Sequence, residues 1–203
     1  MKVPESDEYK TLKAISEGLY KEKGSRFIAL AIPVSTLDEV KTQLERIRKE
    51  YYDARHHCYA YRIGEDPGEV RYNDDGEPSG TAGKPIFGQI QSYNLTNILI
   101  VVVRYFGGIK LGTGGLMQAY KTSSRDAVEN GIIINKVWTT SLKITFEYQK
   151  MNDAMRVIKE ENLKIIRQET TEKCVITLEI RKGNLEGIKN KLKSFEINDS
   201  SVI

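Results

Sequence analysis

An apolar run between two glycine-rich stretches constrains this chain more than any other feature. Ile98 to Val103 is almost entirely Ile, Leu and Val, and it lies between Gly76 to Gly83 and Gly107 to Gly115. Eleven of the 16 glycines fall between Gly64 and Gly115. A short run that is apolar at every position is typical of a strand buried on both faces. The sequence therefore predicts the order loop, helix, buried strand, loop, helix.

The second glycine-rich stretch also predicts an anion site. It leads into a helical pattern that begins near Gly114, runs from about Leu116 to Asn130 and is ended by Gly131. The first N–H groups of a helix lack intrahelical partners and lie at its positive end. We therefore expect phosphate or RNA contacts from a set comprising Lys84, Arg104, Tyr105, Gly107, Gly108, Lys110, Gly112, Gly114 and Gly115. The alternative is that these glycines only form turns that the topology requires.

The sequence matches neither of two common nucleotide-binding motifs. Lys84 is followed by Pro85 rather than Ser or Thr, and Pro78 stands where a P-loop needs glycine. Met117 occupies the position of the third glycine of a dinucleotide-binding fingerprint. Neither motif therefore assigns a nucleotide to the glycine-rich stretches.

An acidic loop lies in the first glycine-rich stretch. Its candidate residues are Asp74, Asp75, Gly76, Glu77, Ser79, Gly80 and Thr81. Three carboxylates so close together suit Mg²⁺ binding or acid–base chemistry. The alternative is a solvated turn whose Asp and Asn side chains bond their own backbone. Ser79 or Thr81 is also a candidate cap for a helix that starts near Thr81.

The run His56 to Ile63 alternates like a strand and carries two reactive side chains. His56 and Cys58 share a face of such a strand, and His57 points the other way. Zinc requires four ligands, and the sequence has no second Cys/His cluster to supply them. A thiol nucleophile would need a third, orienting group that we do not identify. We interpret His56 and Cys58 as bordering a functional groove, and we assign no catalytic residue, resident metal or cofactor.

Aromatic and basic residues alternate through the same region. The aromatic candidates are Tyr59, Tyr61, Tyr72, Tyr93, Tyr105 and Phe106, and the cations near them in sequence are Arg62, Arg71, Arg104 and Lys110. Rings that stack on bases beside cations that pair with phosphates are typical of single-stranded RNA surfaces. Alternating strand aromatics also occur in cores, so both interpretations remain open here.

The remaining pattern divides the chain into two domains. Residues 10–34 suggest a hairpin with Gly24 in its turn, followed by a helix that Ser35 or Thr36 caps. From Trp138 the order becomes β-α-β-β-α-β, as in the ferredoxin-like fold. We therefore expect an α+β protein with domains 1–136 and 137–203.

Composition limits the setting. The chain has 203 residues, 39% of them hydrophobic, and a net charge of only +3, which gives weak support to nucleic-acid binding. No apolar run approaches the ~20 residues of a membrane span, and the polar N-terminus does not resemble a signal peptide. Cys58 and Cys174 are far apart in sequence, which favours two free thiols in a reducing cytoplasm.

Two long segments carry a family resemblance. NDDGEPSGTAGKPI and VVRYFGGIKLGTGGLMQAY, residues 73–86 and 102–120, resemble the signature of the YigZ/IMPACT family. The resemblance implies a ribosomal protein S5 domain 2-like first domain. It also implies a ferredoxin-like second domain similar to a late domain of elongation factor G.

The resemblance also carries functional implications. Relatives of both folds work on RNA and the ribosome, and eukaryotic family members regulate translation through protein partners in the amino-acid starvation pathway. No agreed active site comes with the family. We therefore expect a non-catalytic RNA- or ribosome-associated protein with a role in regulating translation. The alternatives are a Mg²⁺-dependent enzyme acting on a phosphorylated small molecule or nucleotide, and a protein-interaction module of the translation machinery.

Overall fold

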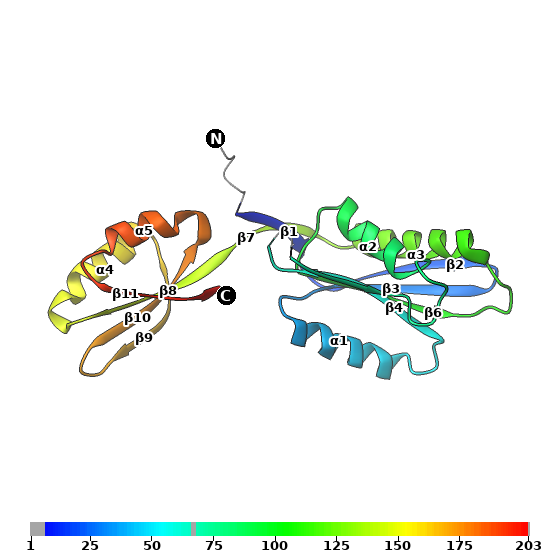
Figure 1. Ribbon diagram of the computed structural model, residues 1–203, viewed down its shortest axis with the longest axis horizontal. Helices are drawn as coiled ribbons and strands as arrows, with labels where there is room; N and C mark the ends of the chain where they lie inside the picture. Colours follow the sequence, from blue (N-terminus) through cyan, green and yellow to red (C-terminus); the bar gives the residue numbers. More distant parts are fainter. Residues whose placement is uncertain (1–6, 66–67, 203) are drawn as a thin grey trace. The chain divides into compact units, whose positions relative to one another are not determined.

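The chain forms two compact units in a computed structural model that describes residues 7–65 and 68–202 (Figure 1). One unit comprises residues 10–135. The other comprises the segment from Lys136 onward together with the N-terminal segment up to Tyr9. The change of pattern at residues 136–138 thus coincides with a structural division. The placement of the N-terminal segment in the second unit was not anticipated from the sequence.

A five-stranded antiparallel sheet forms the centre of the first unit. Its order is β2-β3-β6-β4-β5, and its strands are β2 (Ser16–Glu22), β3 (Ser25–Pro33), β4 (His56–Ile63), β5 (Glu69–Asn73) and β6 (Ile98–Tyr105). Helix α1 (Leu37–Glu50) covers one face, and α2 (Gly83–Ser92) and α3 (Gly112–Glu129) cover the other (Figure 1). The six residues from Ile98 to Val103 are fully buried, so the prediction of a strand covered on both faces is confirmed.

Alternation along β6 divides its side chains between two cores. Ile98, Ile100 and Val102 pack with residues of α2 and α3, whereas Leu99, Val101 and Val103 pack on the side of α1. This period of two follows from strand geometry, because successive side chains point to opposite faces. The central strand therefore holds both helical layers in place.

Local signals explain the ends of several elements. The side chain of Thr36 accepts a hydrogen bond from the N–H of Glu39 and caps α1, as expected. The β2–β3 hairpin turns at Lys23 and Gly24, both at positive φ, which confirms the expected turn at Gly24. A further strand, β1 (Glu8–Leu12), precedes the hairpin and pairs with β7 (Ile133–Val137). β1 was missed because its charged sequence carries little strand pattern.

The two glycine-rich helix starts differ from their expected positions. Helix α3 begins at Gly112, so Gly112, Gly114 and Gly115 lie in its first turn rather than in a loop. Helix α2 begins at Gly83 instead of near Thr81. Glycine is unfavourable in helix interiors. The sequence pattern alone therefore placed the start of α3 too late.

The second unit has the ferredoxin-like order. Its elements are β8 (Thr139–Phe146), α4 (Met151–Glu160), β9 (Lys164–Thr170), β10 (Cys174–Arg181), α5 (Leu185–Lys191) and β11 (Glu196–Val202), with short 3-10 turns at Tyr148–Lys150 and Lys182–Asn184. The sheet order is β11-β8-β10-β9, and both helices cover one face (Figure 1). The predicted β-α-β-β-α-β succession is confirmed, and the protein is α+β.

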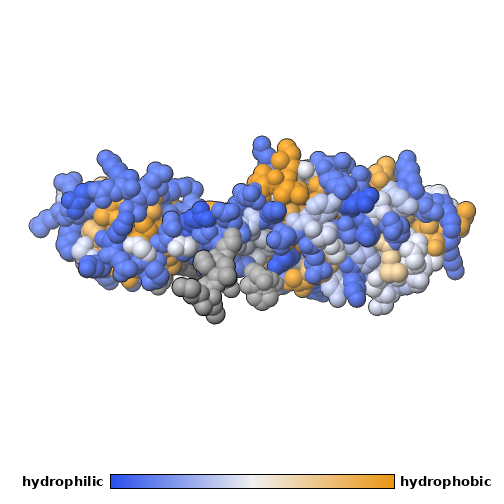
Figure 2. Space-filling view, turned by 90° about the horizontal axis from the view of Figure 1, so that it is seen from above, coloured by the Kyte–Doolittle hydropathy of each residue, from blue (hydrophilic) through white to orange (hydrophobic). Residues whose placement is uncertain are grey.

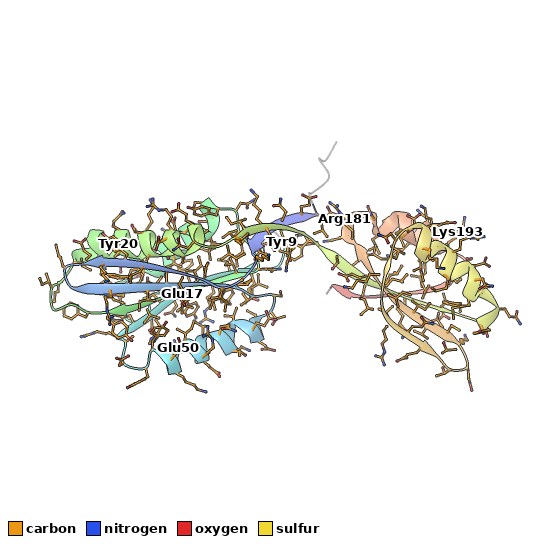
Figure 3. All side chains as sticks on the ribbon, turned by 180° about the vertical axis from the view of Figure 1, so that it is seen from behind. Tyr9, Glu17, Tyr20, Glu50, Arg181 and Lys193 are labelled. Carbon is orange, nitrogen blue, oxygen red and sulfur yellow. The ribbon has the colours of Figure 1, made fainter. Side chains whose placement is uncertain are left out.

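The N-terminal segment is bound to this second unit by specific contacts. The guanidinium of Arg181 donates to both carboxylate oxygens of Asp7, at 2.7 and 2.6 Å. The ring of Tyr9 stacks on that of Trp138 with centroids 4.1 Å apart, and Figure 3 labels Tyr9 and Arg181. These contacts explain why residues 7–9 belong with the C-terminal part of the chain.

Both cysteines are free thiols, as the sequence predicted, and both are buried. Within the described residues, no helix is both long enough and apolar enough to cross a bilayer.

Candidate functional site

The connection between β6 and α3 lies against the tip of the β2–β3 hairpin. A Cβ atom added to Gly107 would fall 1.9 Å from the carbonyl carbon of Gly24, so the two backbones are in direct contact. The N–H of Gly107 donates to the hydroxyl of Ser25 at 3.1 Å. Gly107 is therefore fixed by the hairpin, and its N–H group is not available to a ligand. We define residues 105–117 together with residues 23–26 as the glycine-loop surface.

The glycine-loop surface exposes apolar side chains beside bare backbone. Phe106, Ile109 and Met117 are 42%, 57% and 44% exposed. A Cβ atom at Gly108, Gly112 or Gly114 would meet no other atom within 4 Å. Figure 2 shows orange side chains beside blue ones at the end of the first unit where β6 connects to α3. Another molecule can therefore approach the main chain here without displacing side chains.

Charge on this surface has one sign along the chain. The residues of the glycine-loop surface include Lys23, Arg26 and Lys110 but no Asp or Glu. The N-cap residue of α3 is Leu111, whose side chain makes no capping hydrogen bond. The positive end of α3 therefore has no acidic partner at its cap position. A chain of net charge +3 thus carries a locally cationic segment around an uncapped helix start.

A buried polar cluster lies beneath the surface. Glu77 Oε1 accepts hydrogen bonds from Arg104 Nη1 at 2.5 Å and from the hydroxyl of Tyr120 at 2.8 Å. The side chains of Arg104 and Glu77 are only 7% and 4% exposed. One carboxylate of the first glycine-rich stretch thus binds a residue before the second stretch and a residue after it.

This cluster corrects one expectation. Arg104 was expected to be a free cation for phosphate, but its charge is matched internally by Glu77. Burial raises the pKa of the Tyr120 hydroxyl, so this group stays protonated and donates. Arg104 therefore acts inside the first unit, and the exposed cations of the predicted set are Lys84 and Lys110.

Asp74 occupies the start of α2. Its Oδ1 atom accepts from the N–H groups of Ala82 and Gly83 at 2.9 and 2.8 Å, and its Oδ2 atom accepts from Gly80 at 2.8 Å. A carboxylate at a helix N-terminus is stabilised by the dipole and by the unpaired N–H groups. The anion position at α2 is thus filled by the chain's own side chain.

The expected caps of α2 are therefore wrong. Neither Ser79 nor Thr81 caps the helix, and the Thr81 hydroxyl instead donates to the carbonyl of Pro78 at 2.6 Å. Asp74 was missed as a cap because it lies nine residues before Gly83, outside the spacing of a local capping motif.

The other carboxylates of the acidic loop point elsewhere. Asp75 accepts the N–H of His57 at 2.7 Å and lies 3.5 Å from a guanidinium nitrogen of Arg48. Glu77 is committed to Arg104 and Tyr120, and Asp74 to the start of α2. Among the described residues, no group of three or more His, Cys, Asp or Glu could hold a metal ion. The three carboxylates thus serve three separate structural contacts, which favours the turn interpretation of this loop.

His56 and Cys58 share the face toward α2 and α3, as expected. His56 Nδ1 lies 2.7 Å from the carbonyl oxygen of Asp75, and the Cys58 thiol contacts the Asp74 carbonyl and the Tyr120 hydroxyl. Cys58 is fully buried, so it does not border a solvent-filled groove. Burial raises the pKa of the Cys58 thiol, which disfavours the thiolate that a nucleophile requires.

Exposure separates the six aromatic candidates. Tyr59 and Tyr61 are buried. Tyr93 and Tyr105 are partly buried and donate their hydroxyls to Glu129 and Asp53. Tyr72 is 48% exposed, and its ring stacks on Phe87 of α2. Phe106 lies on the glycine-loop surface and is 42% exposed.

The sheet of the second unit lacks a stacking platform. Strands β8, β9, β10 and β11 contain a single aromatic residue, Phe146, which packs in the core beneath the helices. Lys164 and Glu179 form an ion pair on neighbouring strands. The open face therefore lacks the aromatic rings with which sheet-based RNA-binding modules stack bases.

Comparison with known proteins agrees with the resemblance of the two signature segments. The sequence profile of the Impact N-terminal domain matches residues 23–128, more than half of the chain. The IMPACT family member YigZ of Escherichia coli is 33% identical over 175 residues, covering 85% of this chain and 86% of that protein. The chain belongs to the IMPACT family.

Two further similarities extend this result. The IMPACT family member YvyE of Bacillus subtilis is 42% identical over 130 residues, covering 64% of this chain and 60% of its own. A crystal structure of a hypothetical protein matches with a TM-score of 0.75 at 29% identity, covering 96% of this chain and 98% of the other. The two-unit architecture therefore occurs beyond this chain.

Sequence reasoning missed the importance of Ile109, Met117 and Tyr120. Tyr120 lies four residues after Leu116, a helical spacing that predicts a shared buried face, and both are buried. The exposure of Ile109 and Met117 could not be predicted from the sequence, because apolar residues beside glycines are expected to pack in a core.

Proposed function

We propose that this IMPACT family member is an RNA-associated protein of the translation apparatus that acts by binding, with the glycine-loop surface as its contact. The local charge carries the proposal, because the glycine-loop surface holds Lys23, Arg26 and Lys110 and no carboxylate. The uncapped start of α3 and the open glycines support it, since backbone N–H groups and cations are the groups that contact phosphates. Membership of a family whose eukaryotic members regulate translation gives the setting.

A salt titration of ribosome binding tests this function. We expect the intact protein to co-sediment with ribosomal subunits, and its affinity to fall as salt rises. For single-stranded RNA the logarithm of affinity falls with a slope of about −0.7 per neutralised phosphate. Lys110→Ala should reduce the slope by about that amount.

Lys41 provides a matched control. It is exposed on α1, which covers the opposite face of the sheet from α3. Lys41→Ala should leave both affinity and slope unchanged. If the protein shows no salt-sensitive binding to ribosomal subunits, or if both lysine variants behave alike, the proposed contact is wrong.

One observation favours a second candidate, a module that binds a protein of the translation machinery. Ile109 and Met117 are exposed apolar side chains at the centre of the same surface, and Met is enriched in protein interfaces. Co-purification that survives nuclease treatment and is lost in Ile109→Ser would favour this candidate over RNA binding.

A further inference from the structure

The Phe106 ring has one supported face and one open side. Arg104 Cζ lies 5.6 Å from the centroid of the Phe106 ring and 5.3 Å from that of Phe27. A guanidinium over a ring is attracted by the negative face of the aromatic system. Phe106 nevertheless keeps 42% of its surface exposed. The ring is therefore held from beneath while part of it remains open to solvent.

The support of this ring is itself anchored. Arg104 is nine-tenths buried, and its Nη1 atom is bound to Glu77. Glu77 also accepts from Tyr120 of α3, and Phe27 contacts the Tyr120 ring edge-on at 5.1 Å. Three of the residues in this series of contacts, Glu77, Arg104 and Tyr120, belong to the two signature segments. The buried ion pair between Glu77 and Arg104 holds the guanidinium under the Phe106 ring and keeps it out of solvent.

We infer that Phe106 is a stacking platform for an unpaired nucleobase, with Arg104 and Glu77 as the residues that position it. This inference rests on the proposed RNA contact and narrows it to single-stranded segments. A duplex presents phosphates to the same cations but offers no free base face to the ring. An exposed ring beside Lys110 and bare glycine backbone matches the stacking and phosphate contacts of single strands.

Two RNAs of equal length separate stacking from phosphate contact. One is a labelled ten-nucleotide RNA of mixed sequence without self-complementarity, and the other is its blunt duplex. Fluorescence anisotropy with the full-length protein should show tighter binding of the single strand. Phe106→Leu, which keeps an apolar side chain but removes the ring, should weaken single-strand binding about tenfold and leave duplex binding unchanged. Lys110→Ala should weaken both.

A tryptophan at the same position gives a direct readout. Phe106→Trp should bind the single strand at least as tightly as the parent, and its added fluorescence should be quenched by the single strand but not by the duplex. Arg104→Lys in this background should lose most of the quenching while the variant keeps its duplex affinity. Tyr52→Leu is the matched control, because Tyr52 is an 82% exposed aromatic that follows α1.

The outcomes distinguish this inference from the function on which it rests. If neither RNA binds, the proposed RNA contact is wrong and the platform is wrong with it. If both RNAs bind equally and Phe106→Leu changes neither affinity, the RNA contact stands and the platform is rejected. Equal weakening of both RNAs by Phe106→Leu would also reject it, because the ring would then only maintain the shape of the loop. Full quenching in the Arg104→Lys variant would show that Arg104 does not position the ring.

Discussion

At the scale of single residues, Glu77 connects the first glycine-rich stretch to the strand and the helix that flank the second. Its Oε1 atom binds Arg104 of β6 and Tyr120 of α3, and His56 Nε2 lies 3.9 Å away. A buried ion pair contributes little net stability when it is compared with an apolar pair of the same shape. Removing one partner alone is costly, because the other charge is then left buried and unpaired.

Glu77→Ala is therefore expected to destabilise the protein strongly. The loss should be about 3–5 kcal/mol in the free energy of unfolding, the range for breaking a buried pair on one side. Urea unfolding at neutral pH measures it. Glu45→Ala, at an exposed position of α1, is the control and should change stability by less than about 0.5 kcal/mol. Equal effects of the two variants would contradict the role assigned to Glu77.

The residues of the candidate site were predictable to different degrees. The glycines and Lys110 were predicted from local chemistry, conformational freedom and positive charge, and their role in binding stays a prediction. The partner of Arg104 could not be found, because it lies in another segment. Glu77 is 27 residues from Arg104 and 43 from Tyr120, and no periodicity connects positions so far apart.

At the scale of elements, the contact between β2 and α3 closes one edge of the five-stranded sheet. A Cβ atom on Gly18 would fall 2.3 Å from the backbone nitrogen of Ala127. The N–H of Leu19 donates to Asp126 at 2.8 Å, and the hydroxyl of Ser16 donates to the carbonyl of Ala127 at 2.6 Å. An edge strand offers unpaired backbone groups to other chains, and α3 occupies some of these groups on β2.

Gly18→Ala should force β2 and α3 apart. The added methyl meets backbone rather than a movable side chain, so we expect a loss of about 1–3 kcal/mol in unfolding free energy, typical of overpacking. Gly88→Ala on α2 is the matched control, because its Cβ would meet nothing within 4 Å. Alanine is the better helix former by up to about 1 kcal/mol, so the control should be neutral or stabilising. A stable Gly18→Ala protein would show that the contact is looser than described.

Elements were easier to predict than their ends. β4 and β5 have the bounds that the sequence predicts, His56 to Ile63 and residues 69–73. The start of α3 was placed too late, since glycine weakens the helical pattern although the fold keeps the helix in place. The charged sequence of β1 carries little strand pattern, and only the fold shows that it pairs with β7.

At the scale of the whole molecule, the chain leaves its second unit after Tyr9 and returns to it at Lys136. Asp7 and Glu8 bind the first passage to Arg181 of β10. The Arg181 guanidinium, which donates to the Asp7 carboxylate, lowers the pKa of Asp7 from 3.8 to about 2. The N–H of Gly183 donates to the same carboxylate at 3.0 Å.

This pKa shift predicts a pH dependence of stability. A carboxyl group whose folded pKa is lowered stabilises the fold above its unfolded pKa of 3.8 and loses that contribution as the pH falls toward 2. Arg181 is 43% exposed, so solvent screening limits the contribution to at most about 1 kcal/mol. Asp7→Asn should therefore be slightly less stable than the parent at pH 6, and the difference should shrink below pH 4.

Urea unfolding across this pH range, followed by the fluorescence of Trp138, measures the difference. Asp153→Asn, at a surface ion pair of α4, serves as the control for removing one exposed carboxylate. A difference between Asp7→Asn and the parent that stays constant down to pH 2.5 would contradict the assignment.

Because the second unit contains residues from both ends of the chain, it cannot be produced whole as one continuous fragment. A fragment that starts at residue 137 would lack the ion pair between Asp7 and Arg181 and the Tyr9 ring that stacks on Trp138. Such a fragment should be frayed and prone to protease digestion even if its own βαββαβ order is complete. Joining residues 7–9 to it through a short flexible linker, as in a circular permutation, would restore both contacts.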